Sequence, residues 1–491
     1  MSESIKLLKN SSIMVSYFIF EAVTILVFTI MSARYLGVEQ FGRLNYLLSF
    51  VLLFSMLSDL GTSLGITKLV ANNEVNRFEY INNGVSLRFA LVCATLVITM
   101  GGFIIFGHKE DIPLILILAI SEGIRNMSVY ISYVFRGFQR MEFEPFIMGP
   151  ERLLLVIGGF ILFEMGYGIK EIIYLYLFAR VITLIIAYRF YTSNYGKILP
   201  SMKKLHIIPI IKESLPLATH VISDRINTYS IPVLITFFAG YVETGIYQSA
   251  FKVILLPVAL CVVIAQVLYP AMAAEFAKSG FNKVFDIYFY GLKTLFNLTF
   301  PCAAIFIAYA PEIVHILYGP EYYLSAFVLR QFTPYIILTC VVVMSVLLLP
   351  AIDKQKIIVL FAVSGAFWTI LGGSAFIYLF GLSGAVYTLL IGAGGMTVLY
   401  IFIIGKYSKG HWRFKENIIQ VIAAVVTLSL LMIIKISINA NMFVHAANMI
   451  FGVIVYYSAL YLFGGISKEE KNIINLIISK VYKMQIFQIE G

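Results

Sequence analysis

Several basic side chains fall within long apolar stretches of this sequence, where cations could hold an anion. Arg125, Arg225, Lys252 and Arg330 lie well inside such stretches. A charge at the centre of a bilayer costs at least about 2.5 kcal/mol, so these side chains should face a protein interior or water. A guanidinium group offers a planar fork that suits phosphate oxygens. We therefore predict that these four residues bind a phosphate-bearing group in a cationic cavity.

Internal ion pairing is the alternative use of the same charges. Glu122 lies one helical turn from Arg125, and Asp224 is the neighbour of Arg225. Three further basic residues are interpreted as lying closer to the ends of their stretches, where a long side chain can reach water: Arg88, Arg180 and Lys293. For these three, a structural role is as good an interpretation as a functional one.

Two carboxylates and one histidine could exchange a proton or bind sodium. Glu21 and Asp224 occupy equivalent places near the middle of two apolar stretches, and His220 lies four residues before Asp224, on the same helical face. The alternative is that Asp224 neutralises Arg225 and that Glu21 lines a cavity passively. The sequence leaves both interpretations open.

Other chemistries lack the residues that they need. The run Gly61-Thr62-Ser63-Leu64-Gly65 fits the G-x-S-x-G pattern, but it falls within a predicted membrane helix and not at a strand-to-helix turn. The stretch that ends in Gly107-His108-Lys109 lacks the Gly-Lys-Ser/Thr ending of a P-loop. The six histidines and four cysteines show no ligand spacing. We expect no catalytic residue, no metal and no cofactor.

The composition shows what kind of elements must position these residues. Of 491 residues, 60% are hydrophobic and 13% are charged, whereas soluble domains carry roughly 25% charged residues. Apolar runs long enough for a bilayer recur along the chain and are too continuous for alternating barrel strands. We predict an all-α integral membrane protein with about fourteen spans, at 13–33, 44–66, 84–107, 112–135, 145–165, 171–191, 213–238, 246–270, 288–310, 326–350, 357–380, 382–404, 418–438 and 443–463.

The basic residues also predict the orientation of these spans. With a cytoplasmic N-terminus, the only Lys and Arg in outer loops are Arg34, Arg43, Lys109, Lys170 and Lys435. The positive-inside rule therefore places both termini in the cytoplasm and explains the net charge of +10 without nucleic acid. After the last span, Ser467 and Glu470 predict a capped amphipathic helix at the membrane surface, with a frayed tail as the alternative.

A weak internal repeat groups the spans. At an offset of 203 residues, Glu21 matches Asp224, Gly37 matches Gly240 and Gly42 matches Gly245, so span seven repeats span one. We predict two six-helix bundles in the same orientation around a central cavity, at 1–205 and 206–404. Residues 405–491 then add two helices and a cytoplasmic amphipathic tail.

Several motifs carry a family resemblance. Arg34-Tyr35-Leu36-Gly37 with Phe41-Gly42, then Asp59-Leu60-Gly61, resembles the first hairpin of the oligosaccharide-lipid flippases of the O-antigen (Wzx-like) type. Pro311-Glu312-Ile313 and Leu317-Tyr318-Gly319 resemble that family's segment between helices 9 and 10. The resemblance covers about 1–404 and extends to the superfamily of multidrug, oligosaccharidyl-lipid and polysaccharide exporters. It implies a cavity that opens alternately to each side. One departure is that 357–380 has none of the Asn residues that relatives often carry there.

The resemblance and the cationic positions together predict a flippase and not an enzyme. It would move a polyprenyl-pyrophosphate-linked oligosaccharide to the outer leaflet of a bacterial cytoplasmic (inner) membrane, for O-antigen or lipopolysaccharide synthesis. Expected partners are this glycan, membrane lipids, a proton or sodium ion and a polysaccharide assembly complex. The alternatives are a lipid II flippase, and a cation-coupled multidrug exporter, whose cavity should favour acids. A membrane-embedded polymerase or glycosyltransferase is a different class, which usually needs a larger outer loop.

Overall fold

The computed structural model describes residues 3–408, 414–437 and 442–465, and every regular element in these ranges is helical. The helices are α1 (Glu3–Phe54), α2 (Met56–Asp59), α3 (Thr62–Asn72), α4 (Arg77–Phe106), η1 (Lys109–Asp111), α5 (Ile112–Gly137), α6 (Phe143–Glu164), α7 (Ile169–Tyr195), α8 (Lys204–Phe238), α9 (Tyr241–Ser279), α10 (Phe281–Tyr318), η2 (Pro320–Tyr322), α11 (Tyr323–Ala351), α12 (Gln355–Phe367), η3 (Trp368–Gly372), α13 (Gly373–Ser408), α14 (Phe414–Ser437) and α15 (Met442–Leu462). The amphipathic helix predicted after Ser467 lies outside the described residues.

The helices form more membrane passes than their labels suggest. Ten segments are long and apolar enough to cross a membrane, and two of them, Ser16–Asn72 and Gln355–Ser408, each contain two passes. The chain changes direction at Gly37 and Gly381, where φ is 71° and 56°, values that residues with a Cβ rarely adopt. With α7 and α8, the described residues make fourteen helical passes, and each overlaps one predicted span. The prediction of an all-α multi-pass membrane protein is confirmed.

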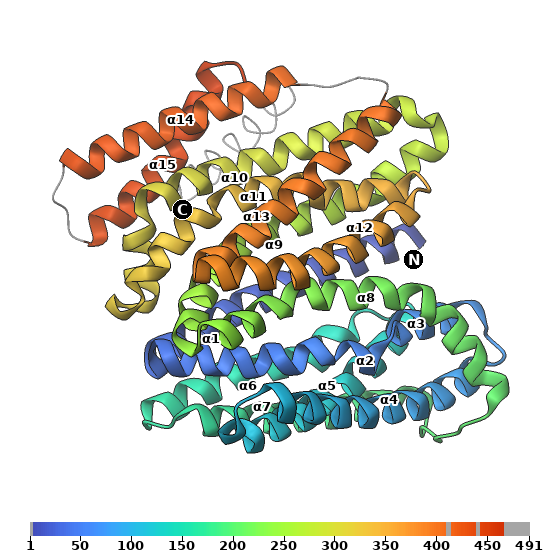
Figure 1. Cartoon of the computed structure of the whole chain (residues 1–491). Coiled ribbons are helices and arrows are strands. Elements are labelled where there is room, and N and C mark those ends of the chain that lie inside the picture. Colours follow the sequence, from blue (N-terminus) through green and yellow to red (C-terminus); the bar gives the residue numbers. More distant parts are fainter. Residues whose placement is uncertain (1–2, 409–413, 438–441, 466–491) are drawn as a thin grey trace, which may run out of the picture.

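The passes lie side by side and run in nearly the same direction (Figure 1). The first part of the chain, α1 to α7, packs together in the blue and teal half of the picture, and α9 to α13 pack together in the other half. Both α1 and α8 contact helices of the two halves. The pair α14 and α15 lies at the edge, where both helices pack against α10.

One buried arginine in the first half is fully paired. Arg88 of α4 is fully buried, pairs with Asp59, and donates hydrogen bonds to Thr62 Oγ1 (2.7 Å) and Ser63 Oγ (3.0 Å). It therefore does not reach water, and it belongs to the packing of α4 against α2 and α3. Removing one partner of such a buried pair costs about 3–5 kcal/mol.

The two halves meet at glycines that the repeat matches. A Cβ on Gly42 would overlap the carbonyl oxygen of Tyr241, and a Cβ on Gly245 would overlap the carbonyl oxygen of Val38. Position 241 lies 203 residues after 38, and 245 lies 203 after 42, so the contact is reciprocal. Small residues let the helix backbones approach this closely. The contact lies at the end of the bundle that carries the turns at 37, 107–111, 165–168, 240, 319 and 381, here called the Gly37 end.

Candidate functional site

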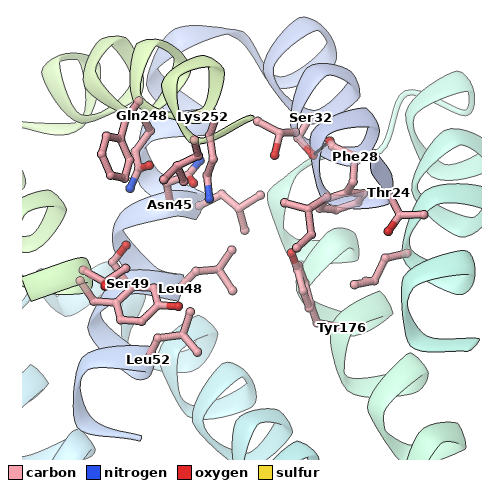
Figure 2. A pocket seen from close by; sticks show the side chains of 18 of the residues that line it. Thr24, Phe28, Ser32, Asn45, Leu48, Ser49, Leu52, Tyr176, Gln248 and Lys252 are labelled. Atoms are coloured by element: carbon pink, nitrogen blue, oxygen red, sulfur yellow. Dashed lines mark hydrogen bonds between the residues drawn. The ribbon is translucent and has the colours of Figure 1, made fainter. Parts of the chain in front are cut away.

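A polar cavity of about 460 Å³ lies between the two halves. Both passes of α1 line it, together with α5, α6, α7, α8 and α9. In Figure 2, Asn45 of α1 and Lys252 of α9 lie on one side of a shared space, and Tyr176 of α7 lies across from them, on the same side as Thr24 and Phe28 of α1. Polar groups converge on this cavity although the helices that carry them are mostly apolar.

Equivalent positions of the repeat line this cavity. The second pass of α1 and the first part of α9 each present residues spaced three, one and three apart, which is one face of a helix. The matching pairs, each 203 residues apart, are Asn45 and Gln248, Leu48 and Phe251, Ser49 and Lys252, and Leu52 and Leu255. The cavity therefore lies where α1 and α9 present the same helical face.

Five cations line the cavity, and most come from the first half of the chain. They are Arg125 of α5, Arg152 of α6, Arg180 of α7, Arg225 of α8 and Lys252 of α9. Sequence reasoning selected three of these, and the structure brings those three together. Arg152 was not among the residues selected from the sequence. Arg180 lies in the middle of α7, so the interpretation that it sits near a span end is wrong.

Three carboxylates accompany these cations. Arg180 Nη2 lies 2.9 Å from Glu122 Oε2, and Arg180 Nε lies 3.4 Å from Glu151 Oε1. Arg125 lies farther from the same two carboxylates, at 3.7 Å and 3.5 Å. Glu122 and Glu151 are almost completely buried behind the wall, so this network holds α5, α6 and α7 together. The internal ion pairing considered for Arg125 is therefore present, although its pairs are long.

Arg152 pairs with Glu21, whereas Arg225 and Lys252 have no carboxylate partner in the part of the chain that the structure describes. Arg225 lies over the ring of Tyr229, with 5.5 Å from its guanidinium carbon to the ring centroid, and its Nη1 lies 3.4 Å from Tyr229 Oη. Lys252 lines the cavity without an ion pair or a hydrogen bond among those residues. Uncompensated charge inside a membrane is costly, so this arrangement suits an anionic ligand that the cavity receives.

Arg330 is not brought to this cavity. It is exposed on α11, and its Nε donates a hydrogen bond to the carbonyl oxygen of Ile307 (3.0 Å). It lines a different pocket at the Gly37 end, with Glu312, His315 and His445. Its proposed role in ligand binding stays a prediction, and it cannot act together with the other three cations in this conformation.

Of the residues predicted for ion coupling, Glu21 and Asp224 are not brought together by the structure. Glu21 lines the cavity and accepts a hydrogen bond from Arg152 Nη2 (2.5 Å). Asp224 is exposed, does not line the cavity and forms no ion pair with Arg225 in the described ranges. The side chain of His220 lies outside the described residues. Of the two whose side chains are described, Glu21 is placed to respond to a ligand in the cavity.

The cavity is closed at the Gly37 end. Beyond the reciprocal glycine contact, the fully buried Asp111 accepts hydrogen bonds from Arg43 Nε (2.7 Å) and from Tyr241 Oη (2.6 Å), which joins the two halves. The end of the first pass is also held, because Tyr322 Oη donates to the carbonyl oxygen of Ala33 (2.8 Å). A close backbone contact and two polar contacts therefore seal one end.

Fourteen passes around a closed-ended, cation-rich cavity define a polytopic membrane protein of the fold found in multidrug and lipid transporters. The fold of this chain is similar to that of a structure titled "Lipid II flippase MurJ, inward closed conformation". The TM-score is 0.77 and the sequence identity is 15%, and the match covers 92% of this chain and 98% of that chain. An inward-facing multidrug resistance MATE family transporter of the MOP superfamily gives a TM-score of 0.64, with 16% identity and coverage of 80% and 96%.

Sequence comparison names the family. The chain belongs to the family described as polysaccharide biosynthesis protein, which it matches over residues 7–275. A Shigella dysenteriae protein named "Putative O-antigen transporter" is 22% identical over 377 residues, which cover 75% of this chain and 90% of that protein. The predicted resemblance to the O-antigen type of flippase is confirmed at the level of the family.

Proposed function

We propose that this chain moves a lipid-linked oligosaccharide, carried on polyprenyl diphosphate, across a membrane by alternating access. The observation that carries the proposal is the pair of cations without carboxylate partners, Arg225 and Lys252, in a cavity between the two halves. The family and its O-antigen transporter relative support the same cargo class.

The charge of the cavity matches this cargo. Five cations line the cavity and three carboxylates lie among them, which leaves an excess of two positive charges. A diphosphate esterified at both ends carries two negative charges. Charge-assisted hydrogen bonds of this kind contribute about 1.5–3 kcal/mol each. The head group of the lipid would therefore be held between α8 and α9 on one side and α5 and α6 on the other.

The alternatives fit less well. A cation-coupled multidrug exporter would need an excess of acids in the cavity, and the excess here is of bases. The cargo of a lipid II flippase contains the same diphosphate. It differs from the cargo proposed here only in what is attached to that diphosphate. An enzyme of polysaccharide synthesis would need a sizeable polar region between passes, and the described connections at the Gly37 end are short.

A flipping assay tests the proposal directly. Purified protein would be reconstituted into vesicles that hold a fluorescent lipid-linked oligosaccharide, and exposure of the sugar on the opposite face would be followed with a membrane-impermeant quencher. We expect accelerated flipping of the oligosaccharide lipid and no acceleration for a cationic dye. Acceleration of the dye alone would assign the chain to the multidrug exporters.

The proposed transport cycle moves the bundles 1–205 and 206–404 relative to each other in the cytoplasmic membrane, with both termini inside. Under this orientation the Gly37 end faces outward, and the cavity is closed to the outside. We expect a cysteine at Lys203, between α7 and α8, to react with impermeant thiol reagents only from the cytoplasm. A cysteine at Lys109, in η1 at the Gly37 end, should react only from outside intact cells. The reverse pattern would invert the proposed orientation.

Coupling to an ion gradient is proposed to act through Glu21. Its carboxylate already neutralises Arg152, so a proton or sodium ion that competes for Glu21 would free Arg152 for the cargo. We expect Glu21→Gln protein to flip the lipid without stimulation by an imposed pH or sodium gradient. Asp224→Asn serves as the comparison, because Asp224 does not line the cavity. A full gradient response of Glu21→Gln would exclude this route.

A further inference from the structure

A second hollow lies on the outside of the bundle, next to the cavity. It has a volume of about 580 Å³ and lies between the first pass of α1 and the beginning of α6. Residues spaced along one face of each helix form it, and most are apolar, among them Ile13, Tyr17, Phe20, Phe146, Gly149 and Leu153. Phe146 and Leu153 are 64% and 46% exposed, so the hollow opens toward the surrounding lipid.

The hollow exists because α6 lacks side chains at its floor. Gly149 is buried, and a Cβ placed there would contact only Phe20 Cε1, at 3.9 Å. Pro150 follows inside the helix and has no amide proton to donate. A glycine followed by a proline in the first part of α6 therefore leaves a groove where a larger residue would have filled the space between α1 and α6.

The groove ends at the wall of the cavity. Phe20 and Leu153, at one end of the groove, are the chain neighbours of Glu21 and Arg152. The ion pair between Glu21 and Arg152 lines the cavity and joins the same two helices. The groove that faces lipid and the cationic cavity thus meet at neighbouring positions of α1 and α6, with this ion pair on the cavity side.

We infer that this groove is the binding site for the polyprenyl chain of the cargo. The inference rests on the proposed function, because it assigns the diphosphate of the same molecule to the cavity. A lipid whose head group is held beside Arg152 must lead its chain out of the bundle into apolar surroundings. The space between α1 and α6 offers such a route at the position of that residue. Because the surrounding lipid is as apolar as the groove, the chain would be held there by close packing between α1 and α6 and not by removal from water.

Binding measurements on filled-groove variants test the inference. The probes are undecaprenyl diphosphate, which has a long chain, and dimethylallyl diphosphate, which has the same head group and one isoprene unit. We expect Gly149→Trp to weaken binding of the long-chain probe by about tenfold or more, because the new ring would fill the space in which the chain packs, and to leave the short-chain probe unchanged. Gly101→Trp is the matched control, because Gly101 is exposed on α4 with no atom within 4 Å of its Cβ position.

The outcomes separate the groove from the proposed function. Equal effects of Gly149→Trp and Gly101→Trp on the long-chain probe would overturn the groove assignment, as would equal losses for the two probes. If wild-type protein bound neither diphosphate, or if Arg225→Gln with Lys252→Gln weakened neither, the head-group site itself would be wrong, whatever the groove variant did.

Photocrosslinking of wild-type protein gives a second measurement that does not depend on the variant folding. Undecaprenyl diphosphate with a photoreactive group on its chain should label the peptide around Phe146. Phe160, which is 51% exposed on the same helix but outside the groove, is the internal comparison. Labelling at Phe160 equal to that around Phe146 would show that the chain meets only the general lipid-facing surface. Competition by an excess of ordinary phospholipid that abolished the labelling would assign the groove to membrane lipid.

Discussion

Protein in which Arg225 and Lys252 are both replaced by Gln is expected to lose flipping of the oligosaccharide lipid. Neither side chain neutralises a carboxylate in the described structure, so their removal leaves no buried acid unpaired. At about 1.5–3 kcal/mol for each lost charge-assisted contact, the affinity for the diphosphate should fall by roughly two orders of magnitude or more. The measurement is flipping in reconstituted vesicles, together with binding of a polyprenyl diphosphate.

Lys170→Gln is the matched control for this pair, because it removes a positive charge from an exposed residue of α7 that does not line the cavity. It should flip the lipid at the wild-type rate. The thermal unfolding midpoint of the double variant should stay close to that of wild type, since the two cations support no ion pair. Equal losses in the control and in the double variant would reject a cavity-specific role for Arg225 and Lys252.

Gly42→Leu is expected to abolish transport by keeping the Gly37 end from closing. The new side chain would overlap the backbone at Tyr241, and crowding of this kind costs about 1–3 kcal/mol. A shift of that size changes a two-state equilibrium by about 5- to 150-fold. We therefore expect a cysteine placed at Ser32, which lines the cavity near this end, to react faster with an impermeant reagent added from the Gly37 side.

Gly245→Leu should give the same result, because its Cβ would overlap the carbonyl oxygen of Val38 in the reciprocal contact. Gly395→Leu on α13 is the control, since no atom lies within 4 Å of its Cβ position. Normal flipping by Gly42→Leu, with an unchanged labelling rate at Ser32, would show that this contact does not limit the cycle.

The fold was predictable because each membrane pass is recognisable in the sequence as a long apolar run. Runs of about 20 apolar residues can only be satisfied as helices in lipid, and the fourteen predicted spans each overlap a helical pass. Hydropathy did not show how far the helices extend beyond the bilayer. For example, α9 and α10 continue as helices through residues that were assigned to a connection.

The site was predictable in part, because charge at membrane depth is rare and therefore informative. That signal identified Arg125, Arg225 and Lys252, and the repeat could have added Asn45 and Gln248, which match each other at the same offset. Charge at membrane depth does not distinguish the central cavity from the pocket at the Gly37 end. Arg330 was therefore grouped with Arg125, Arg225 and Lys252. Depth along a helix was available from the sequence, but the direction in which a side chain points was not.

Pairing also changes how charge removal at Arg125 should be interpreted. Arg125 and Arg180 share Glu122 and Glu151, which are almost completely buried. Loss of either arginine leaves carboxylates less compensated, and breaking a buried pair costs about 3–5 kcal/mol. Reduced export by an Arg125→Ala variant would therefore combine lost binding with lost stability, which the pair Arg225 and Lys252 avoids.

The reciprocal contact at the Gly37 end has the symmetry of an isologous dimer interface within one chain. Residue 42 meets 241 while 245 meets 38, as two copies of a half-length chain would pair across a two-fold axis. The surroundings break this symmetry, because Arg43 binds Asp111 whereas its counterpart Ile246 packs in an apolar core. A self-complementary backbone contact therefore sets the distance between the halves. The contact between Arg43 and Asp111, which is present on one side of the axis, further stabilises the closed state.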